Sequence, residues 1–301
     1  MIISIIIPTI DNVSKTDRTV SSLLSDKHFL MSDYEILIVN DGASPEIKNY
    51  VEEKSKNQVN IKCINISESK GAYYARNQAI KQAKGEYIGF FDAALEVPSN
   101  WYTDLKDNLS NYDYIAGDVK VEAKNEMTIG EKIDYVKAFP IKSYLENDRF
   151  GVTAFLIVKK SIFDHIGYFD ESHSGGDGEF GKRVYEYGFK QVYYDKAPAL
   201  HPPRTFKQQY YKKIRDYKGI LEMNQKYPDK YPNKPTSIRS IFNCFTAIPA
   251  NIFKFRTNKV YKSGLFTFPE YCIGVICFWG IEAASRMYVW FNRNKIIGTK
   301  L

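Results

Sequence analysis

The sequence predicts an open α/β fold, with a mostly parallel sheet flanked by helices and a helical extension after it. Three observations predict this class. Short β-branched runs alternate with helix signals throughout residues 1–91, and such alternation is typical of parallel strands joined by right-handed crossovers. With 301 residues, 44% hydrophobic and 15% aromatic, the chain is able to bury a large core. Residues 204–262 carry 14 Lys and Arg against three Asp and Glu, which marks a basic C-terminal part.

The first 91 residues supply four predicted strands separated by three helices. The opening run is apolar and β-branched, so it predicts a fully buried strand that Pro8 ends. Thr16 or Asp17 is expected to cap the first helix, and Ser44 with Pro45 begins the second. Alanines repeat at every fourth position of the third helix, so its small face is able to lie close to the sheet. The expected strands are 2–7, 34–39, 59–66 and 86–91, and the expected helices are 16–26, 44 onward, and 71–83.

After residue 92 the alternation becomes less regular. From Pro202 onward the chain is basic, aromatic and prone to form helices. We therefore expect one sheet-containing domain over residues 1–205 and a helical extension over 206–301. The elements expected between them are strands at 112–121, 152–158 and 190–194, helices at 98–109, 161–166 and 177–187, and a mixed segment at 128–149 that lies over the site.

The net charge of +7 is unevenly distributed along the chain. Residues 204–262 have a balance of +11, so the rest of the chain carries −4. Such asymmetry indicates a basic face for an anionic partner. At this point a nucleic acid and an anionic membrane surface are both open.

The C-terminal part also contains an apolar segment. Residues 271–281 are eleven consecutive residues without a charge, whereas a membrane span needs about 20 apolar residues. The segment is therefore expected to be too short to cross, and its aromatic and basic neighbours predict an amphipathic anchor in the membrane plane. The alternative is a helix packed on the first domain. The basic neighbours are Lys254, Arg256, Lys259, Lys262, Arg286, Arg293 and Lys295.

The cysteines and the N-terminus point to a cytosolic chain. The four cysteines form no CxxC pair and match no zinc spacing, so free thiols in a reducing compartment are expected. The first residues have no basic segment and too short an apolar run for a signal peptide. No GxGxxG follows the first strand, so the dinucleotide-binding fingerprint is absent.

Polar residues with complementary chemistry follow three of the predicted strands. Asp41 suits a base N–H or a ribose hydroxyl, although an Asp before Gly42 is also common in turns. Arg76 and Asn77 lie in the first turns of a helix, where a guanidinium and backbone N–H groups suit a pyrophosphate; an ordinary surface ion pair is the alternative. Asp92 leaves a buried strand and suits a divalent ion that bridges phosphates, or else a simple turn. Because the carboxyl ends of parallel strands share one edge, these residues predict a single crevice.

Two further segments suit proton transfer and metal binding. Asp177 and Glu179 open a helix after a flexible Ser-Gly-Gly stretch, and an ionised acid in a crevice is a natural general base. Their alternative role is to complement the positive end of the helix. His201 follows the last strand, where a neutral imidazole suits a third metal ligand or a purely structural role.

Together these segments resemble the inverting nucleotide-sugar glycosyltransferases of family 2, which have the GT-A fold. The resemblance covers about residues 1–205. Five matching segments occur in the same order along the chain as in that family. The matching segments are Ser4–Thr9 for the first strand, Asn40–Ser44 for the "DDGS" turn with Asn in its first acidic position, Lys70–Asn77 for the "G…ARN" helix start, Gly176-Asp177 where the family has Glu-Asp, and Arg183 of the same helix.

The resemblance implies a Rossmann-like GT-A sheet and an enzyme that moves a sugar from a nucleotide-sugar, a UDP-sugar being favoured, to an acceptor hydroxyl. The hydroxyl would attack the anomeric carbon in one displacement and invert its configuration. Asp177 would be the catalytic base, and Glu179 and Arg183 would contact the acceptor or support the site. The implied donor-binding residues are Thr9, Asp41, Arg76 and Asn77, and the implied ligands of Mn²⁺ or Mg²⁺ are Asp92, at the start of the DxD motif, and His201.

The chain departs from the family pattern at the DxD motif, which here is Asp92-Ala93-Ala94. Ala94 stands where the second acid belongs, and Glu96 is a less well placed substitute. Three explanations are open: a deliberate replacement of a natural Asp, an enzyme that works with Asp92 and His201 alone, or a protein that has lost activity. The family-like neighbours favour the first. Gly in place of Glu at position 176 is milder, because the proposed base is kept.

Two rival functions remain at this level. A nucleotidyltransferase would need a glycine-rich basic loop after the first strand, and residues 8–15 contain no glycine. A non-catalytic binder of membranes or nucleic acid would not need acids at three separate positions of one crevice. We favour a peripheral enzyme at the inner face of a bacterial membrane, which serves surface polysaccharide synthesis, uses a saccharide or lipid-linked acceptor and binds no nucleic acid.

Overall fold

The computed structural model describes residues 2–57, 60–106, 109–137, 139–232, 237–253 and 264–298. The predicted strand start at Val59 and the basic residues Lys254, Arg256, Lys259 and Lys262 lie outside the described residues. The chain forms two compact units. The sheet unit comprises Met1–Lys120, Phe139–Glu171 and Gly176–Pro202, and the helical unit comprises Val121–Ala138, Ser172–Gly175 and Pro203–Leu301. The domain boundary at residue 205 stays a prediction, because two short internal segments cluster with the C-terminal helices.

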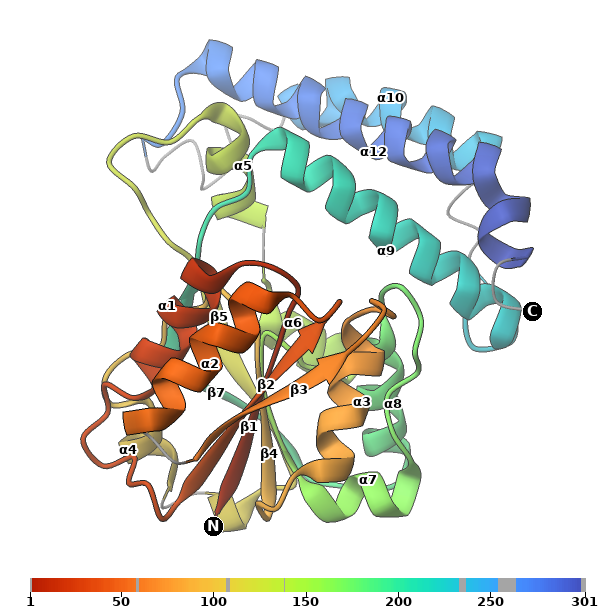
Figure 1. The fold of residues 1–301 in the computed structure, drawn as a ribbon. Coiled ribbons are helices and arrows are strands. Elements are labelled where there is room, and N and C mark those ends of the chain that lie inside the picture. Colours follow the sequence, from red (N-terminus) through yellow and green to blue (C-terminus); the bar gives the residue numbers. More distant parts are fainter. Residues whose placement is uncertain are drawn as a thin grey trace. The chain divides into compact units, whose positions relative to one another are not determined.

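The sheet unit is built on a seven-stranded sheet in the order β3-β2-β1-β4-β6-β5-β7 (Figure 1). The pairs β3–β2, β2–β1 and β1–β4 are parallel, whereas β6 runs antiparallel to both β4 and β5. The predicted α/β sheet is confirmed. Its strands are β1 Ile3–Thr9, β2 Tyr34–Asp41, β3 Ile61–Ile66, β4 Tyr87–Phe91, β5 Tyr114–Val121, β6 Phe155–Lys159 and β7 Gln191–His201.

Helices cover both faces of this sheet (Figure 1). Alternate side chains of a strand point to opposite faces, and β1 follows this rule: Ile3, Ile5 and Ile7 join one buried cluster, whereas Ile6 joins another. The first cluster includes residues of α1, α2 and α4, and the second includes residues of α3, α7 and α8. The helices of the sheet unit are α1 Val13–Leu23, α2 Pro45–Asn57, α3 Ala72–Gln82, α4 Trp101–Lys106, α6 Ile141–Asp148, α7 Lys160–Ile166 and α8 Gly176–Glu186, with a short 3₁₀ turn at Leu109–Asn111.

Two predicted boundaries in the first half are wrong, each for a physical reason. Pro8 does not end β1, because the pairing of β1 with β4 stops at Ile6 and its pairing with β2 continues to Thr9. The missing N–H of Pro8 therefore costs no ladder bond to β4. The first helix begins before Thr16, because the side chain of Asn12 accepts a hydrogen bond from the backbone N–H of Lys15 at 2.8 Å and caps it.

The helical unit contains four helices among the described residues, and buried charges hold two of them together. Helix α12 packs against α9, α10 and α5. Glu282 of α12 is 5% exposed and forms an ion pair with Lys213 of α9 at 2.6 Å. Tyr217 of α9 also donates a hydrogen bond to Glu282. The four helices are α5 Ile129–Lys137, α9 Phe206–Lys226, α10 Ile238–Phe253 and α12 Phe268–Gly298.

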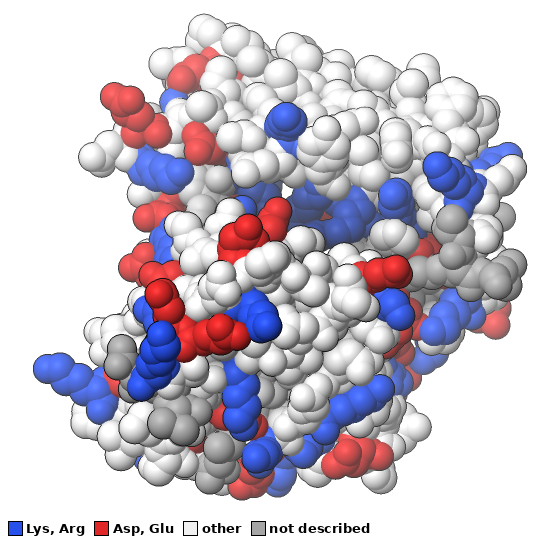
Figure 2. Space-filling view, viewed as in Figure 1, with Lys and Arg blue, Asp and Glu red and all other residues white. Residues whose placement is uncertain are grey.

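The apolar tail is longer than the sequence suggested. The eleven residues without a charge belong to α12, which is 31 residues long, and by length and composition alone this helix would be sufficient to cross a membrane. The prediction of a segment too short to span is therefore wrong, because the helix runs on beyond the charge at Glu282 that bounded the segment. Figure 2 shows few charged side chains over α10 and α12, and many basic ones over α9. Nine large apolar side chains of α10 and α12 are exposed: Ile238, Phe242, Phe245, Phe268, Ile273, Ile276, Met287, Tyr288 and Phe291.

Candidate active site

The carboxyl ends of β1, β2 and β4 meet at one edge of the sheet. Thr9 ends β1 and pairs with Asn40, next to Asp41 at the end of β2. Asp92 follows β4, which pairs with β1 on its other side. An open α/β sheet binds ligands outside this edge. The topology of the sheet therefore brings Thr9, Asp41 and Asp92 to the same edge, where the crevice is predicted.

Asp41 holds the loop that leads into α3. Its carboxylate is 3% exposed and accepts hydrogen bonds from Ser69 Oγ at 2.9 Å, from the Lys70 N–H at 3.1 Å and from the Gly71 N–H at 3.2 Å. Gly71 has a φ of 96°, which favours glycine, and it precedes the first turn of α3. The sequence predicted a contact of Asp41 with the nucleotide, and that contact stays a prediction beside this structural role.

Thr9 joins the end of β1 to α1 through a hydrogen bond between side chains. Its hydroxyl accepts a hydrogen bond from Thr16 Oγ1 at 2.9 Å, so the end of β1 is tied to α1. The side chain is 6% exposed. Donor binding by Thr9 likewise stays a prediction.

Arg76 and Asp92 form an ion pair across this edge. Arg76 Nη2 lies 2.6 Å from Asp92 Oδ1, with 4% of the Arg side chain and 38% of the Asp side chain exposed. Helix α3 carries Arg76 in its second turn, facing the end of β4. Arg76 Nε is buried and has no hydrogen-bond partner among the described residues. Buried donors are nearly always satisfied by protein, water or ligand, so Arg76 keeps one N–H that the described residues do not satisfy.

Asp177 is linked to the same pair through Tyr73. The Tyr73 hydroxyl donates to Asp177 Oδ1 at 2.9 Å, and its ring centre lies 5.6 Å from Arg76 Cζ. Asp92, Arg76, Tyr73 and Asp177 thus form one connected chain of side chains, which we call the acid–arginine chain. The sequence reasoning missed Tyr73. The signal was its position three residues before Arg76, because a spacing of three places two side chains on one helix face.

The carboxyl of Asp177 is suited to take up a proton. It is half-buried at the start of α8, and removal from water raises its pKa above the ordinary value of 3.8. The hydrogen bond from Tyr73, the charge of Arg76 and the backbone N–H groups of Thr153 and Gly178 oppose this shift. Burial also raises the pKa of Tyr73 well above its ordinary value, so the phenol keeps its proton and remains a donor.

Glu179 and Arg183 form an ion pair on α8, and Arg183 also binds the segment that follows α7. Arg183 Nε and Nη2 donate to the two carboxylate oxygens of Glu179 at 2.8 and 2.7 Å. The same guanidinium donates to the carbonyl oxygens of Tyr168, at 2.8 Å, and Ile166. This two-point ion pair restrains the orientation of α8, and support of the site by these two residues stays a prediction. A contact of either residue with the acceptor stays a prediction.

Asn77 positions the loop that precedes α8. Its amide Nδ2 donates to the Phe169 carbonyl at 2.9 Å and to Glu171 Oε1 at 3.0 Å, and its Oδ1 accepts from the Phe169 N–H at 3.1 Å. Both donor hydrogens are therefore used within the protein. The predicted contact of Asn77 with a nucleotide is untested, and the structure gives this side chain a supporting function.

The residues present do not fit a metal ion held by several protein ligands. Asp92 is already paired with Arg76. His201 lies with Nδ1 2.7 Å from the carbonyl oxygen of Pro202, and its ring packs on Phe139 at 5.3 Å between centres. Over the described ranges no group of three His, Cys, Asp or Glu side chains is close enough to hold a metal. Metal binding by Asp92 and His201 as a pair stays a prediction.

Position 94 is unusual in its backbone. Ala94 is 5% exposed and has a φ of 79°, a left-handed conformation that Gly, Asn and Asp adopt far more readily than Ala. Its N–H donates to the Lys15 carbonyl at 2.8 Å, which fixes the turn. The backbone thus suits the Asp that the resemblance places here. The expected substitute Glu96 is paired with Arg18 at 2.8 Å and points to α1.

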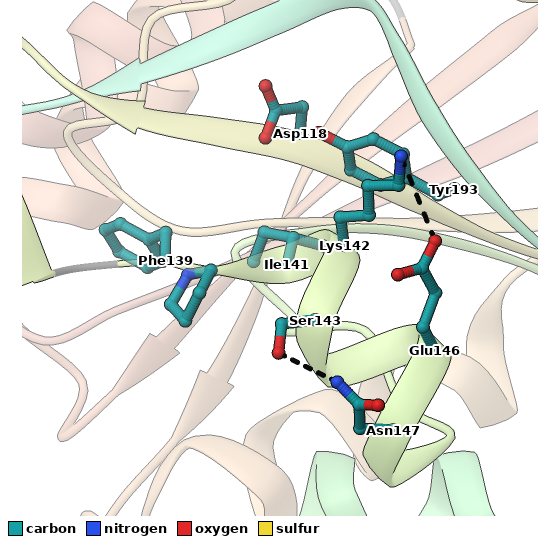
Figure 3. A pocket seen from close by; sticks show the side chains of 9 residues that line it. Asp118, Phe139, Ile141, Lys142, Ser143, Glu146, Asn147 and Tyr193 are labelled. Atoms are coloured by element: carbon teal, nitrogen blue, oxygen red, sulfur yellow. Dashed lines mark hydrogen bonds and ion pairs between the residues drawn. The ribbon is translucent and has the colours of Figure 1, made fainter.

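A recess lies beside His201 in the sheet unit (Figure 3). It has a volume of about 390 Å³ and includes Phe139, whose ring contacts His201. Lys142 pairs with Glu146, and Asn147 donates to Ser143 Oγ, so much of its polar lining is satisfied by neighbours on α6 (Figure 3). The recess offers one aromatic face and several small polar groups. Its lining residues are Asp118, Phe139, Pro140, Ile141, Lys142, Ser143, Glu146, Asn147 and Tyr193.

Comparison with known proteins decides the class of the molecule. Residues 4–167, more than half of the chain, match the family model described as Glycosyl transferase family 2. The chain belongs to glycosyl transferase family 2. This family-2 chain is therefore a glycosyltransferase, which decides against the nucleotidyltransferase and the non-catalytic binder that the sequence left open.

Relatives agree with this assignment. The chain is 25% identical to glycosyltransferase AglE from Haloferax volcanii over 224 residues, which cover 73% of each protein. It is 32% identical to the poly(ribitol-phosphate) β-N-acetylglucosaminyltransferase TarP from Staphylococcus aureus over 172 residues, or 54% of this chain and 50% of TarP.

Solved structures confirm the GT-A fold. The mannosyltransferase PcManGT from Pyrobaculum calidifontis, in complex with GDP-Man and Mn²⁺, aligns with a TM-score of 0.65 over 94% of this chain and 85% of its own, at 13% identity. Staphylococcus aureus TarS 1–349 with UDP-GlcNAc aligns with a TM-score of 0.56 over 95% and 92% of the two chains, at 17% identity. At these identities the likeness establishes the fold alone.

Proposed function

We propose that this family-2 glycosyltransferase moves a sugar from a nucleotide-sugar, with a UDP-sugar favoured, to a hydroxyl of a saccharide or lipid-linked saccharide by a single inverting displacement. The observation that carries the proposal is the acid–arginine chain, which connects the proposed base Asp177 with the proposed phosphate-binding residues Arg76 and Asp92. A base and a phosphate site must lie within one sugar diphosphate of each other for such a reaction, and contacts between these side chains meet that requirement.

In the proposed reaction Asp177 takes the proton of the acceptor hydroxyl. The hydroxyl oxygen then attacks the anomeric carbon, while the bond from that carbon to the diphosphate oxygen breaks and the diphosphate leaves with the electron pair. Burial raises the pKa of Asp177 and so strengthens it as a base. Tyr73 keeps the carboxylate oriented, and Arg76 with the N–H groups of the first turn of α3 meets the negative charge of the leaving group.

Divalent-ion dependence is also part of the proposal. Structures with this fold have been solved with Mn²⁺, including PcManGT with GDP-Man. In the present chain Asp92 is the one carboxylate of the DxD position, and Mg²⁺ or Mn²⁺ in phosphate sites often keeps only one or two carboxylates and several waters. Because the described residues form no metal cluster, no step of the proposed reaction is assigned to the ion.

The cellular setting is proposed from the relatives and from the helical unit. Relatives include TarP and a GalNAc(5)-diNAcBac-PP-undecaprenol β-1,3-glucosyltransferase from Campylobacter jejuni. We propose a role in bacterial surface polysaccharide synthesis, at the inner face of the membrane. The exposed apolar side chains of α10, with Ile238, Phe242 and Phe245 on one helix face, support peripheral contact with lipid.

The central test measures donor binding and turnover separately. Titration calorimetry with UDP, CDP and GDP, each with Mn²⁺ and with EDTA, identifies the nucleotide and the role of the ion. Asp177→Asn is expected to bind the preferred nucleotide within about twofold of the natural chain and to lose at least about a hundredfold in turnover. Asp164→Asn, an exposed acid of α7, serves as the matched control. Equal turnover by Asp177→Asn, or no heat with any nucleotide, would overturn the proposed function.

The membrane proposal has its own test. Sedimentation with vesicles of phosphatidylglycerol is expected for the full chain and is expected to fall in the double variant Phe242→Ser/Phe245→Ser, whose side chains are 65% and 50% exposed. Tyr185→Ser/Tyr187→Ser, two exposed aromatics of the sheet unit, is the control. Undiminished sedimentation of the α10 double variant contradicts the proposal.

A further inference from the structure

A second cavity lies wholly within the helical unit, and none of the proposed catalytic residues borders it. Its volume is about 450 Å³. Helices α9 and α12 and the short loop at 172–175 supply its walls, and we call it the tyrosine–basic pocket. Its lining residues are His173, Tyr210, Tyr211, Ile214, Arg215, Lys218 and Tyr288.

The basic side chains of this pocket are placed by helix geometry. Tyr211, Arg215 and Lys218 are four and three residues apart on α9, so they share one face of the helix. Throughout the described part of the chain, no hydrogen bond or ion pair joins Arg215 or Lys218 to another side chain. The other basic residues of that stretch are neutralised, because Lys212 pairs with Asp216 at 2.7 Å and Lys213 pairs with Glu282 at 2.6 Å.

The lining combines two kinds of recognition in one space. A guanidinium and an ammonium on one face suit the oxygens of a phosphate. The three tyrosine side chains add flat apolar faces, on which the C–H face of a sugar ring packs, and hydroxyl donors at their tips. Tyr211 is 57% exposed and Tyr288 is 42% exposed, so these faces are open to a solute. A molecule that carries both a sugar and a phosphate matches this combination better than either group alone.

The loop that borders the pocket is held firmly to α9. The N–H of His173 donates to Glu222 Oε2 at 2.8 Å, and the His173 ring lies 2.6 Å from Glu222 Oε1. Ser174 Oγ donates to Asp216 Oδ1 at 3.0 Å. A Cβ at Gly219 would lie 2.2 Å from the Ser174 carbonyl oxygen, so glycine alone permits this close approach.

The sequence connects this loop with the proposed base. His173 precedes Asp177 by four residues, and four residues of chain span at most about 14 Å. The Cα atoms of His173, which borders the pocket, and of the proposed base Asp177 are therefore no farther apart than this. This limit follows from the length of the connecting chain alone.

We propose that the tyrosine–basic pocket binds a phosphate of the acceptor, so that the acceptor is a phosphate-bearing saccharide. This inference rests on the proposed function, since it names the acceptor class of that same reaction. Arg215 and Lys218 contact the phosphate, and Tyr210, Tyr211 and Tyr288 pack on the adjoining sugar. The pocket is a specificity element and takes no part in the chemical step.

The test measures binding of N-acetylglucosamine 1-phosphate to the full chain saturated with UDP, which blocks the donor site. Arg215→Gln/Lys218→Gln is expected to weaken this binding by at least about tenfold, because it removes both positive charges that would face the phosphate. Lys207→Gln/Lys226→Gln removes the same charge from exposed positions of the same helix and is expected to leave the affinity unchanged. Uncharged N-acetylglucosamine is expected to bind at least about tenfold more weakly than its phosphate.

Three results would distinguish a phosphate site for the acceptor from the other uses of the tyrosine–basic pocket. Equal affinity of both double variants for the sugar phosphate overturns the proposal. Loss of sedimentation with phosphatidylglycerol vesicles by Arg215→Gln/Lys218→Gln, with unchanged affinity for the sugar phosphate, assigns the pocket to lipid headgroups and also overturns it. UDP affinity and donor hydrolysis in water are read in the same variants. If the natural chain neither binds nor hydrolyses a nucleotide-sugar, the proposed function fails, whereas a failure of the pocket leaves both readouts intact.

Discussion

Tyr73→Phe tests the acid–arginine chain with the smallest change available. The substitution keeps the ring, which lies 5.6 Å from Arg76 Cζ and 5.7 Å from the ring of Phe169. It removes only the hydroxyl that donates to Asp177 Oδ1 at 2.9 Å. A hydrogen bond to a charged group contributes about 1.5–3 kcal/mol. We therefore expect turnover at neutral pH to fall about 10- to 100-fold as the carboxylate loses both its orientation and its stabilising donor.

The same substitution should also shift the pH dependence of turnover in a defined direction. Burial raises the pKa of Asp177, and the Tyr73 hydrogen bond lowers it. Removal of that bond raises the pKa further, so the ionised base is lost at a higher pH and the acidic limb of the rate profile moves upward. The assay is turnover against pH for the natural chain, Tyr73→Phe and the control Tyr74→Phe, whose ring contacts Lys70. An acidic limb that stays in place in Tyr73→Phe refutes the assignment of Asp177 as the base.

Three other substitutions test separate contacts. Ala94→Asp is expected to raise turnover in a Mn²⁺ titration, because it adds a carboxylate at a position whose φ of 79° suits Asp. The control Ala94→Gly adds no metal ligand and should show no gain. Equal Mn²⁺ titrations of the two variants would contradict a metal-binding role for an acid at position 94. Glu179→Gln is expected to cost about 2 kcal/mol in the free energy of unfolding, since it weakens the ion pair with Arg183. Asp164→Asn, at an exposed position of α7, should leave the denaturation midpoint unchanged. Asp177→Asn is expected to stabilise the fold at neutral pH: the folded pKa of Asp177 is raised, so its charge costs stability that returns as pH falls toward 3.8. A melting temperature difference that grows on acidification would contradict the last sign.

The sequence was sufficient to place the first four strands along the chain and to predict which of their end residues share one edge of the sheet. β-branched runs bounded by turn residues identified the first four strands, because burial on both faces leaves a continuous apolar signal. The residues at the carboxyl ends of those strands were identified by topology alone. Asp92 and Asp177 are 85 positions apart in the chain, and the contacts of Arg76 and Tyr73 connect their side chains.

What the sequence did not show depends on tertiary contacts. Several residues at the edge have their polar groups occupied by the protein, such as Asn77 on the loop before α8 and Asp41 on the loop before α3. No local pattern distinguishes a side chain that binds a ligand from one that holds a loop. The length of α12 was underestimated because Glu282, an apparent end of the apolar segment, is neutralised by Lys213 from another helix.

The covalent path of the chain has a consequence for engineering. The polypeptide passes between the sheet unit and the helical unit five times, at residues 120/121, 138/139, 171/172, 175/176 and 202/203. Neither unit is therefore encoded by one uninterrupted stretch of gene. A chimera that joins the first 205 residues to a foreign tail would keep Ser172–Gly175 but lose Glu222 and Asp216, to which that stretch is bonded. Acceptor preference in this protein should be altered by substitution within the existing helices, since exchange of the whole tail would release the segment that leads directly into Asp177.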